Sequence, residues 1–317
     1  MDDWLLNILV CPQDHNKLHV EKNTLVCPDG HLYPCVDNIP ILLRDDVKKT
    51  QELLKQKSIN NSSRDQGFVD QFVQEAIAAT NGIIWKSQIN KLKTYPVPEI
   101  PIPKANEQCF LDIGCNWGRW SISAARKGYK VIGIDHNLNA ILAAKRVAKQ
   151  LNISAQFLVA DGRYLPFAES TFDYIFSYSV IQHFDKDDAK LCLKEIARTL
   201  KLSGKSLIQM PNTIGIRNLF HQLKRGFKRP SNFDVRYWNL NELKTTFTNI
   251  IGPTELEADA YFNLNPDIAN IKCLPYYYQY TILCSETLRK MSKNIPWMLN
   301  IADSVFVSSM RKLSKQN

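Results

Sequence analysis

From residue 108 onward, short runs of apolar residues alternate with segments whose apolar residues recur at helical spacing. Runs this short, separated by amphipathic segments, are typical of buried strands that alternate with helices. The pattern therefore predicts an α/β fold, a parallel sheet with helices on both faces. The expected strands are 109–113, 130–134, 156–159, 172–176 and 206–210, and the expected helices are 118–127, 138–150 and 186–200. A further helix at 239–247 and strands at 255–262 and 304–307 complete the prediction.

The first hundred residues follow other patterns. Residues 1–44 contain two short strand-like runs and the apolar stretch Ile39–Leu43, but they are too few to hold a large core of their own. A polar stretch follows, and apolar spacing then indicates helices within 66–93. Prolines alternate through 95–103, so that segment must be extended. We expect a small domain over 1–44, a helical linker and cap over 45–104, and the main domain over 105–317.

Composition narrows the class of protein. Apolar residues make up 44% of the 317 and charged residues 22%, which excludes a wholly disordered chain, a collagen and a coiled-coil rod. No apolar stretch is long enough to span a bilayer. The acidic start and the eight scattered cysteines favour a cytoplasmic protein with reduced thiols. The net charge of +9 permits an anionic partner without requiring one.

The candidate chemistry lies at the ends of three successive strands. Asp112 precedes a turn that contains Gly114 and Gly118, Asp135 ends the second strand, and Asp161 follows the third. The carboxyl edge of an open parallel sheet is where such folds bind ligands, and a carboxylate at the second tip can accept both hydroxyls of a ribose. The glycine spacing is not the dinucleotide signature, which disfavours a nicotinamide dehydrogenase. Three acids would repel phosphates, but they suit the cationic adenosine compound S-adenosylmethionine.

Residues 108–210 resemble a class I S-adenosylmethionine-dependent methyltransferase. The matching pieces, in order, are Asp112-Ile-Gly-Cys-Asn-Trp-Gly118, the acid Asp135, Asp161-Gly-Arg-Tyr-Leu-Pro-Phe167 and Phe172-Asp-Tyr-Ile-Phe-Ser-Tyr-Ser-Val-Ile-Gln-His183. The resemblance implies a seven-stranded, mostly parallel, Rossmann-like sheet whose last strand is antiparallel.

The same resemblance implies a role for each matching residue. Asp112 and Gly114 would line the methionine end of the cofactor, and Asp135 would hold its ribose. Asp161 would accept from the adenine amine, with the backbone of Gly162 and Arg163 beside the ring. Ser177, at the tip of the fourth strand, would flank the transferred methyl group. Cys115, Gly118 and His136 complete the expected cofactor site; the side chain of Cys115 is expected to pack rather than to act as a nucleophile.

His183 is the candidate general base. It follows the fourth strand on the loop that would face the acceptor, and a histidine that only hydrogen-bonds its loop is the alternative. A base is needed only where the acceptor must lose a proton. The tip sequence Ser177-Tyr178-Ser179 lacks the Asn/Asp-Pro-Pro-Tyr/Phe pattern of enzymes that methylate nucleobase or glutamine nitrogens. Transfer to oxygen, carbon or a different nitrogen therefore stays open.

A basic and aromatic segment follows the fifth strand, from Arg217 to Trp238. It has three interpretations: a nucleic-acid surface, an amphipathic cap over the acceptor, or a solvated helix face. A second aromatic group, Tyr276–Tyr278, is a candidate for the wall of the acceptor site.

Residues 5–43 resemble the zinc-ribbon-like activator subunits that partner methyltransferases of tRNA, rRNA and release factors. Shared features include Ile8-Leu-Val-Cys-Pro12, Cys27-Pro28 and Asn38-Ile-Pro-Ile-Leu-Leu43. In Cys11-Pro-Gln-Asp14 and Cys27-Pro-Asp-Gly30 the second cysteine of each expected pair is missing. We therefore expect a degenerate site without metal; the alternative is a zinc site made by Cys11, His15, Cys27 and His31.

The sequence thus predicts a methyltransferase that uses S-adenosylmethionine. A small-molecule acceptor is favoured by the aromatic segments, whereas RNA or a translation factor is favoured by the N-terminal resemblance and the positive charge. The non-enzymatic alternative is a scaffold or regulator that binds the cofactor without turnover. The oligomeric state stays open.

Overall fold

The chain was analysed as a computed structural model, which describes residues 2–44, 69–228, 230, 234–264 and 268–312. By their internal contacts the residues divide into two compact units, Met1–Phe172 and Asp173–Asn317. This division differs from the three segments expected from the sequence, whose boundaries stay a prediction. The polar stretch at the start of the expected linker lies outside the described residues.

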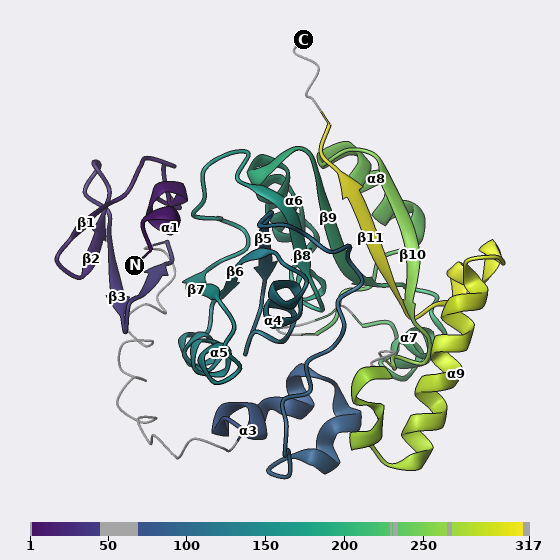
Figure 1. Cartoon of the computed structure of the whole chain (residues 1–317). Helices are drawn as coiled ribbons and strands as arrows, with labels where there is room; N and C mark the ends of the chain where they lie inside the picture. The colour runs from purple at the N-terminus through teal and green to yellow at the C-terminus, as the bar shows by residue number, and fades with distance from the viewer. Residues whose placement is uncertain (1, 45–68, 229, 231–233, 265–267, 313–317) are drawn as a thin grey trace. The chain divides into compact units, whose positions relative to one another are not determined.

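The first unit joins the N-terminal strands to the start of the alternating region (Figure 1). Its strands pair in the order β1-β2-β3-β4-β7-β6-β5. The elements are α1 (Asp3–Ile8), β1 (His19–Glu21), β2 (Thr24–Val26), β3 (Leu32–Val36), β4 (Ile39–Leu42), α3 (Gln71–Thr80), the 3-10 helix η1 (Ile83–Gln88), β5 (Cys109–Ile113), α4 (Arg119–Arg126), β6 (Lys130–Asp135), α5 (Leu138–Gln150) and β7 (Ala155–Ala160).

The second unit carries strands in the order β8-β9-β11-β10. β11 runs antiparallel to both β9 and β10, as expected for the last strand. The elements are β8 (Phe172–Ser177, whose first residue closes the first unit), η2 (Ile181–His183), α6 (Lys186–Thr199), β9 (Leu200–Pro211), α7 (Ile216–Lys224), α8 (Leu240–Ile250), β10 (Thr254–Ala260), η3 (Ile268–Cys273), α9 (Tyr276–Ser292), η4 (Pro296–Ile301) and β11 (Ser304–Met310).

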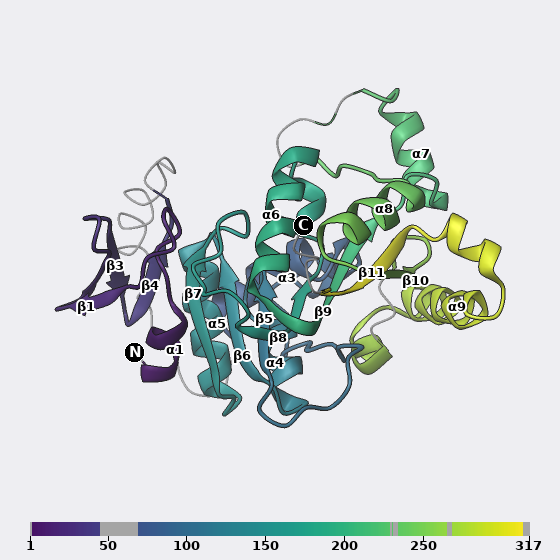
Figure 2. The same ribbon diagram turned by 90° about the horizontal axis from the view of Figure 1, so that it is seen from above.

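The expected seven-stranded, mostly parallel sheet is not confirmed as such, because the observed sheet is larger and mixed. Eleven strands are assigned in the described residues, and their pairings are mixed. β4, β7, β6 and β5 run parallel, whereas β1 to β4 pair antiparallel, as do β9, β11 and β10. The four additional strands come from residues 1–44, which pair antiparallel with one another and join the sheet through β4. Their last strand, β4, pairs in parallel with β7, Ile41 opposite Val159 and Leu42 opposite Ala160 (Figure 2).

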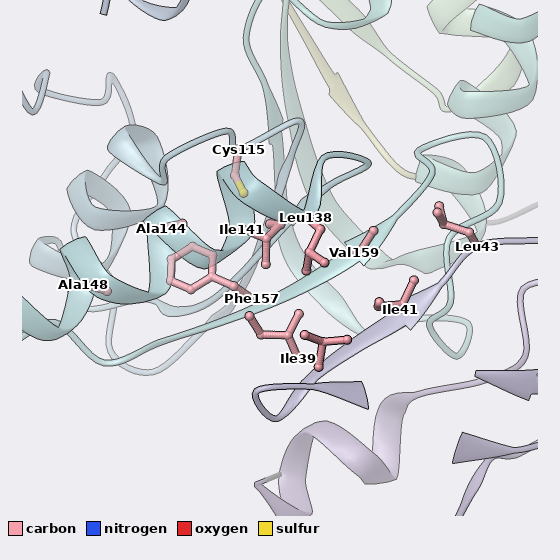
Figure 3. Close-up of a cluster of buried hydrophobic side chains, with 11 residues drawn as sticks. Ile39, Ile41, Leu43, Cys115, Leu138, Ile141, Ala144, Ala148, Phe157 and Val159 are labelled. Carbon is pink, nitrogen blue, oxygen red and sulfur yellow. The ribbon is translucent and has the colours of Figure 1, made fainter. Parts of the chain in front are cut away.

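A shared hydrophobic core explains why β4 joins the α/β sheet. Ile39, Ile41 and Leu43 are buried against side chains of β7 and α5, among them Phe157 and Val159 (Figure 3). A unit of about 40 residues rarely buries enough apolar surface by itself. The N-terminal strands of this chain obtain that burial from the sheet that also carries the candidate site.

The segment before β5 lies against helix α5 and the glycine turn. Arg146 of α5 donates from Nε to Asp70 Oδ2 at 2.6 Å, and Asp70 is also the N-cap of α3. The indole Nε1 of Trp117, in the turn after β5, donates to Thr80 Oγ1 at 3.2 Å. The expected helices within 66–93 correspond to α3 and η1, and the described residues of this segment thus reach the turn that opens α4.

Candidate functional site

The glycine turn after β5 is fixed against the end of β6. The backbone N–H groups of Gly114 and Cys115 both donate to the carbonyl of Ile134, at 2.8 and 2.9 Å. Gly114 and Gly118 have φ of 74° and 83°, and a Cβ at Gly118 would also lie 3.2 Å from the ring of Phe157. Positive φ combined with close packing explains why glycine occupies these positions. The turn therefore presents its backbone at the carboxyl edge of the sheet.

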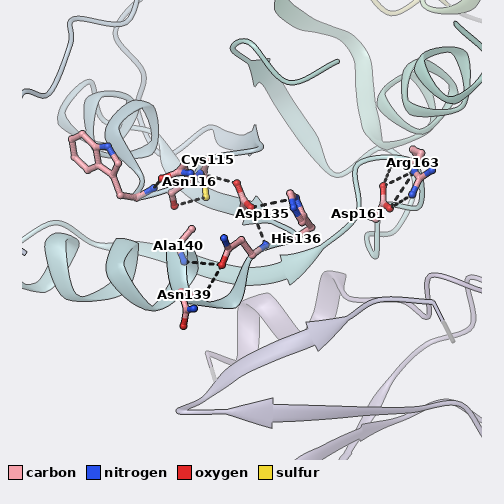
Figure 4. A network of polar contacts seen from close by, with 10 residues as sticks. Cys115, Asn116, Asp135, His136, Asn139, Ala140, Asp161 and Arg163 are labelled. Atoms are coloured by element: carbon pink, nitrogen blue, oxygen red, sulfur yellow. Dashed lines mark hydrogen bonds and ion pairs between the residues drawn. The ribbon is translucent and has the colours of Figure 1, made fainter. Parts of the chain in front are cut away.

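Asp135 ends β6 directly beside this turn (Figure 4). Its Oδ2 accepts from the backbone N–H of Asn116 at 3.0 Å, and its Oδ1 accepts from that of Asn137 at 2.9 Å. His136 Nδ1 lies 3.5 Å from the same carboxylate, and the imidazole is half exposed. Burial raises the pKa of Asp135, while His136 and the backbone N–H donors oppose that rise. The carboxylate is thus held in one orientation at the strand tip.

Asp112 is more deeply placed than the sequence indicated. Its side chain is 1% exposed, and its Oδ2 accepts from Ser121 Oγ at 2.6 Å. Burial raises the pKa of Asp112 to about 7, despite the hydrogen bond from Ser121 and the charge of Arg119. Asp112 therefore ties β5 to α4, and its contact with the methionine end of a cofactor stays a prediction.

The third acid follows β7. Asp161 forms a bidentate pair with Arg163, with 2.7 Å between Arg163 Nη2 and Asp161 Oδ2, and it also accepts from the backbone N–H of Arg163 (Figure 4). Gly162 between them is buried. The parallel pairing of β5, β6 and β7 places Asp112, Asp135 and Asp161 at one edge of the sheet, as the spacing predicted.

The N-terminal segment holds the loop that carries Asp161. The backbone of Val10 donates to Pro166 at 3.0 Å, and that of Ala168 donates to Ile8 at 2.9 Å. The Arg44 guanidinium lies 4.3 Å from the ring centroid of Tyr164. The loop expected beside the adenine is therefore braced from the N-terminal side by hydrogen bonds and a cation–π contact.

Cys115 belongs to the core shared with β4, and its thiol also donates to the carbonyl of Asn116 in the turn at 3.6 Å. Its side chain is buried, and burial raises the thiol pKa well above its usual value. A thiol of this kind is not a nucleophile, in agreement with the packing role predicted from the sequence.

Ser177 and His183 belong to the second unit. Ser177 is fully buried at the end of β8. His183 ends η2; its carbonyl accepts from Arg236 Nη1 at 2.7 Å, and its Nε2 lies 3.3 Å from Gln182 Nε2. The roles of Ser177 beside the methyl group and of His183 as a base stay predictions. Tyr276 and Tyr277, the candidate acceptor wall, are exposed at the start of α9.

Two site residues were missed by sequence reasoning. Ser121 orients Asp112, and Asn137 both caps α5 and donates its N–H to Asp135. The capping role of Asn137 could have been predicted, because an asparagine directly before an apolar helical segment is a preferred N-cap. The role of Ser121 could not have been predicted, since the sequence does not show which group a serine inside a helix hydrogen-bonds.

A cluster of metal-ligand type lies in the N-terminal segment. Cys11, Asp14, Cys27 and His31 each bring one ligand atom within 4.8 Å of the others. Asp14 Oδ2 lies 2.9 Å from His31 Nδ1 and accepts from Cys27 Sγ at 3.1 Å. His15, which the sequence suggested as a ligand, is not in this group. Asp14, the residue before it, takes that place.

The donor types of this cluster fit a zinc ion. Two thiols, an imidazole and a carboxylate are all ligands that Zn²⁺ takes in tetrahedral sites. Burial acts to raise the pKa of Asp14, but hydrogen bonds from the backbone of Asn16 and from Cys27, Cys11 and His31 outweigh it and lower that pKa to about 2. A complete Cys-x-x-Cys pattern would have cysteines at positions 14 and 30. Here Asp14 itself and His31, the neighbour of Gly30, supply the two remaining donors.

Comparison with known families gives two matches. A methyltransferase-domain family matches residues 110–204, and the Trm112p-like protein family matches residues 2–38. The UPF0434 protein PMI0721 of Proteus mirabilis is 44% identical over 52 residues, which cover 16% of this chain and 88% of that protein.

The alternating region matches parts of several curated proteins and solved structures. The ubiquinone biosynthesis O-methyltransferase of Pelagibacter ubique is 30% identical over 115 residues, 36% of this chain and 46% of that enzyme. The chain spans about a quarter of two further curated relatives, at 23% and 24% of their lengths. Among solved structures, the complex between the Haloferax volcanii Trm112 methyltransferase activator and its putative methyltransferase matches with 18% identity and a TM-score of 0.46, over 67% of this chain and 86% of that one.

Proposed function

Because the chain joins a Trm112p-like N-terminal domain to a class I S-adenosylmethionine-dependent methyltransferase domain, we propose that it methylates an O, C or N atom of a small molecule. Methyl transfer from S-adenosylmethionine is the chemistry of this class, so the reading as a scaffold without turnover is not retained. What we propose beyond the family is the class of acceptor and the role of each site residue.

The fixed carboxylate of Asp135 carries the proposal. Two backbone N–H groups orient it at the edge of the sheet, beside a turn built on glycine. An oriented carboxylate at this position suits two vicinal hydroxyls, as in a ribose. In the proposed complex Asp135 holds the ribose, Asp161 accepts from the adenine amine, and the backbone of the turn lies against the methionine end.

The cofactor supplies a methyl group already activated on a sulfonium. What the protein adds is position and exclusion of water. Ser177, at the end of β8, would flank the transferred methyl, and His183 would take a proton from an acceptor that must lose one.

A small-molecule acceptor is supported by the relative that acts in ubiquinone biosynthesis, a pathway with a small-molecule product. RNA or a translation factor is the second candidate, supported by the Trm112p-like domain and the net charge of +9. Transfer of a radiolabelled methyl group from S-adenosylmethionine distinguishes the two. The purified chain is offered a panel of phenols, carboxylic acids and amines, and separately total RNA and release factors.

We expect label in the small-molecule fraction, and His183→Gln should lower turnover of acceptors that lose a proton while leaving S-adenosylhomocysteine affinity unchanged. His221→Gln, a histidine on exposed α7, is the matched control. Label that enters RNA or protein, but none of the small molecules, would overturn the small-molecule proposal and leave the methyltransferase assignment intact.

We also propose that Cys11, Asp14, Cys27 and His31 hold a structural zinc ion, which revises the expectation of a degenerate site. A metal would replace hydrogen bonds that now join these four side chains. The ion would join the loop at Cys11 to the turn at Cys27, and its binding free energy would add to the stability of this end of the chain.

The proposal predicts about one zinc per chain after purification with zinc present, and a Co²⁺-substituted protein with the visible absorption of a tetrahedral thiolate site. Metal content is measured by mass spectrometry. Asp14→Ala and His31→Ala should lose the metal, whereas His15→Ala, an adjacent histidine outside the cluster, should retain it. Equal zinc in all three variants, or no zinc in the wild type, would contradict the site.

A further inference from the structure

Helix α7 of the second unit presents its apolar side chains outward. Ile216, Leu219, Phe220 and Leu223 follow the i, i+3, i+4, i+7 spacing of one helix face, and they are 39% to 61% exposed. Single exposed apolar residues are common, but a contiguous group on one face marks an interaction surface. Ile214 before the helix and Phe227 after it, at 50% and 61% exposed, extend the group. We call these six residues the α7 face.

The opposite side of α7 is polar, and it is this side that is buried. Asn218 and Gln222 are 2% and 8% exposed; Asn218 Nδ2 donates to the carbonyl of Asn212 at 2.9 Å, and Gln222 Nε2 donates to that of Thr213 at 2.7 Å. At the start of the helix, Asp303 Oδ1 accepts from the backbone N–H groups of Arg217 and Asn218. These bonds fix the rotation of the helix about its axis, so the α7 face cannot turn inward without breaking them.

Positive charge accompanies the α7 face. Arg217, His221 and Lys224 are exposed, and at about 100° per residue they share one flank of the helix, next to the apolar face. Lys228 is exposed beyond the helix end. The sequence contains no acidic residue from position 211 to position 230. The helix lies at the margin of its unit (Figure 2).

We propose that the α7 face docks on the surface of an anionic lipid bilayer. An outward apolar face with lysine and arginine along its border is the arrangement of helices that lie in the membrane interface. The apolar side chains enter the boundary between headgroups and acyl chains, while the cations meet the phosphates. The proposal concerns attachment only and does not depend on the proposed function. Among the described residues, no helix is long and apolar enough to cross a bilayer.

Charge and shape favour a bilayer over the other occupants. A second copy docked through the same face with its helix antiparallel would bring the two cationic flanks together, and like charges repel. A single-stranded nucleic acid would need aromatic rings for stacking, but Ile216, Leu219 and Leu223 occupy much of the face. An anionic bilayer satisfies both the apolar side chains and the cations.

Vesicle flotation with the full chain tests the proposal. Vesicles of phosphatidylcholine alone are compared with vesicles that also contain phosphatidylglycerol, at low and high salt. We expect the wild type to float with the anionic vesicles and to be released by salt. Phe220→Ser with Leu223→Ser should lower the bound fraction at least about tenfold, and Arg217→Glu with Lys224→Glu should do the same. Leu202→Ser, which removes a leucine that is 52% exposed in β9 of the same unit, is the matched control and should bind as the wild type does.

Thermal melting of each variant establishes that the fold is intact, since all the substitutions replace exposed side chains. Three results would overturn the proposal: wild type that stays unbound, α7 variants that bind as well as the wild type, or Leu202→Ser that loses as much binding. Two further measurements test the other occupants. In sedimentation without lipid, a dimer that Phe220→Ser converts to monomers would assign the α7 face to a second copy. In an RNA-binding assay, salt-sensitive binding that is lost in the same variants would assign the face to RNA.

Discussion

Replacing Asp135 with alanine should weaken the binding of S-adenosylhomocysteine at least about a hundredfold, since two hydrogen bonds from ribose hydroxyls to a charged acceptor are lost together. The side chain also orients the turn, because its oxygens accept from the backbone N–H groups of Asn116 and Asn137. Alanine leaves both donors without their partner. Titration calorimetry with S-adenosylmethionine and S-adenosylhomocysteine measures the affinity.

Two further variants separate ligand binding from orientation of the turn. Asp135→Asn keeps the shape and one acceptor oxygen, so it should lose less affinity than alanine. Asp187→Ala removes a carboxylate that is 93% exposed at the start of α6 and should leave the affinity unchanged. An Asp135→Ala protein that melts as the wild type does and binds the cofactor equally well would remove Asp135 from the cofactor site.

The second large effect concerns the pH dependence of stability. Burial raises the pKa of Asp112 to about 7, from an ordinary value of 3.8. Between these two values the folded protein keeps a proton that the unfolded chain has released, so the free energy of unfolding falls as the pH rises. A difference of about three pKa units corresponds to about 4 kcal/mol, lost between about pH 4 and pH 7.

Asp112→Asn should remove the contribution of this carboxyl to the pH dependence. Asparagine can still accept the hydrogen bond from Ser121, but it carries no proton to release. The free energy of unfolding, measured by denaturant titration from pH 4 to pH 8 without ligand, should fall less steeply in the variant, which should be the more stable protein above pH 7. Parallel curves for wild type and variant would mean that Asp112 titrates near its ordinary pKa in the folded chain.

The α/β core and the three acids could be predicted because each depends on local pattern. Short apolar runs predicted β5, β6 and β7. Because these strands are parallel, the residues at their carboxyl ends lie at one edge of the sheet. The deep burial of Asp112 could not be predicted, because it depends on Ser121 one helix turn into α4. The roles of Ser177 and His183 stay predictions made from family resemblance.

Long-range contacts account for the other differences. The pairing of β4 with β7 joins residues more than a hundred positions apart, and no periodicity in 1–44 reports it. The exchange of His15 for Asp14 in the metal-ligand cluster depends on the direction of one turn, in which His15 takes a φ of 62°. The sequence marked the basic, aromatic character of the α7 segment, but only the hydrogen bonds of Asn218 and Gln222 reveal which face of the helix is outward.

Because β4 and β7 belong to one polypeptide, the contact between the Trm112p-like segment and the α/β sheet should not depend on protein concentration. A Trm112p-like module on a separate chain would leave its enzyme at low concentration, whereas here the module is tethered by one polypeptide. The covalent connection gives the module an effective concentration on the order of millimolar at its binding surface, independent of the total protein concentration. Specific activity should therefore stay constant on serial dilution, and proteolytic cutting between residues 45 and 68 should make it depend on concentration.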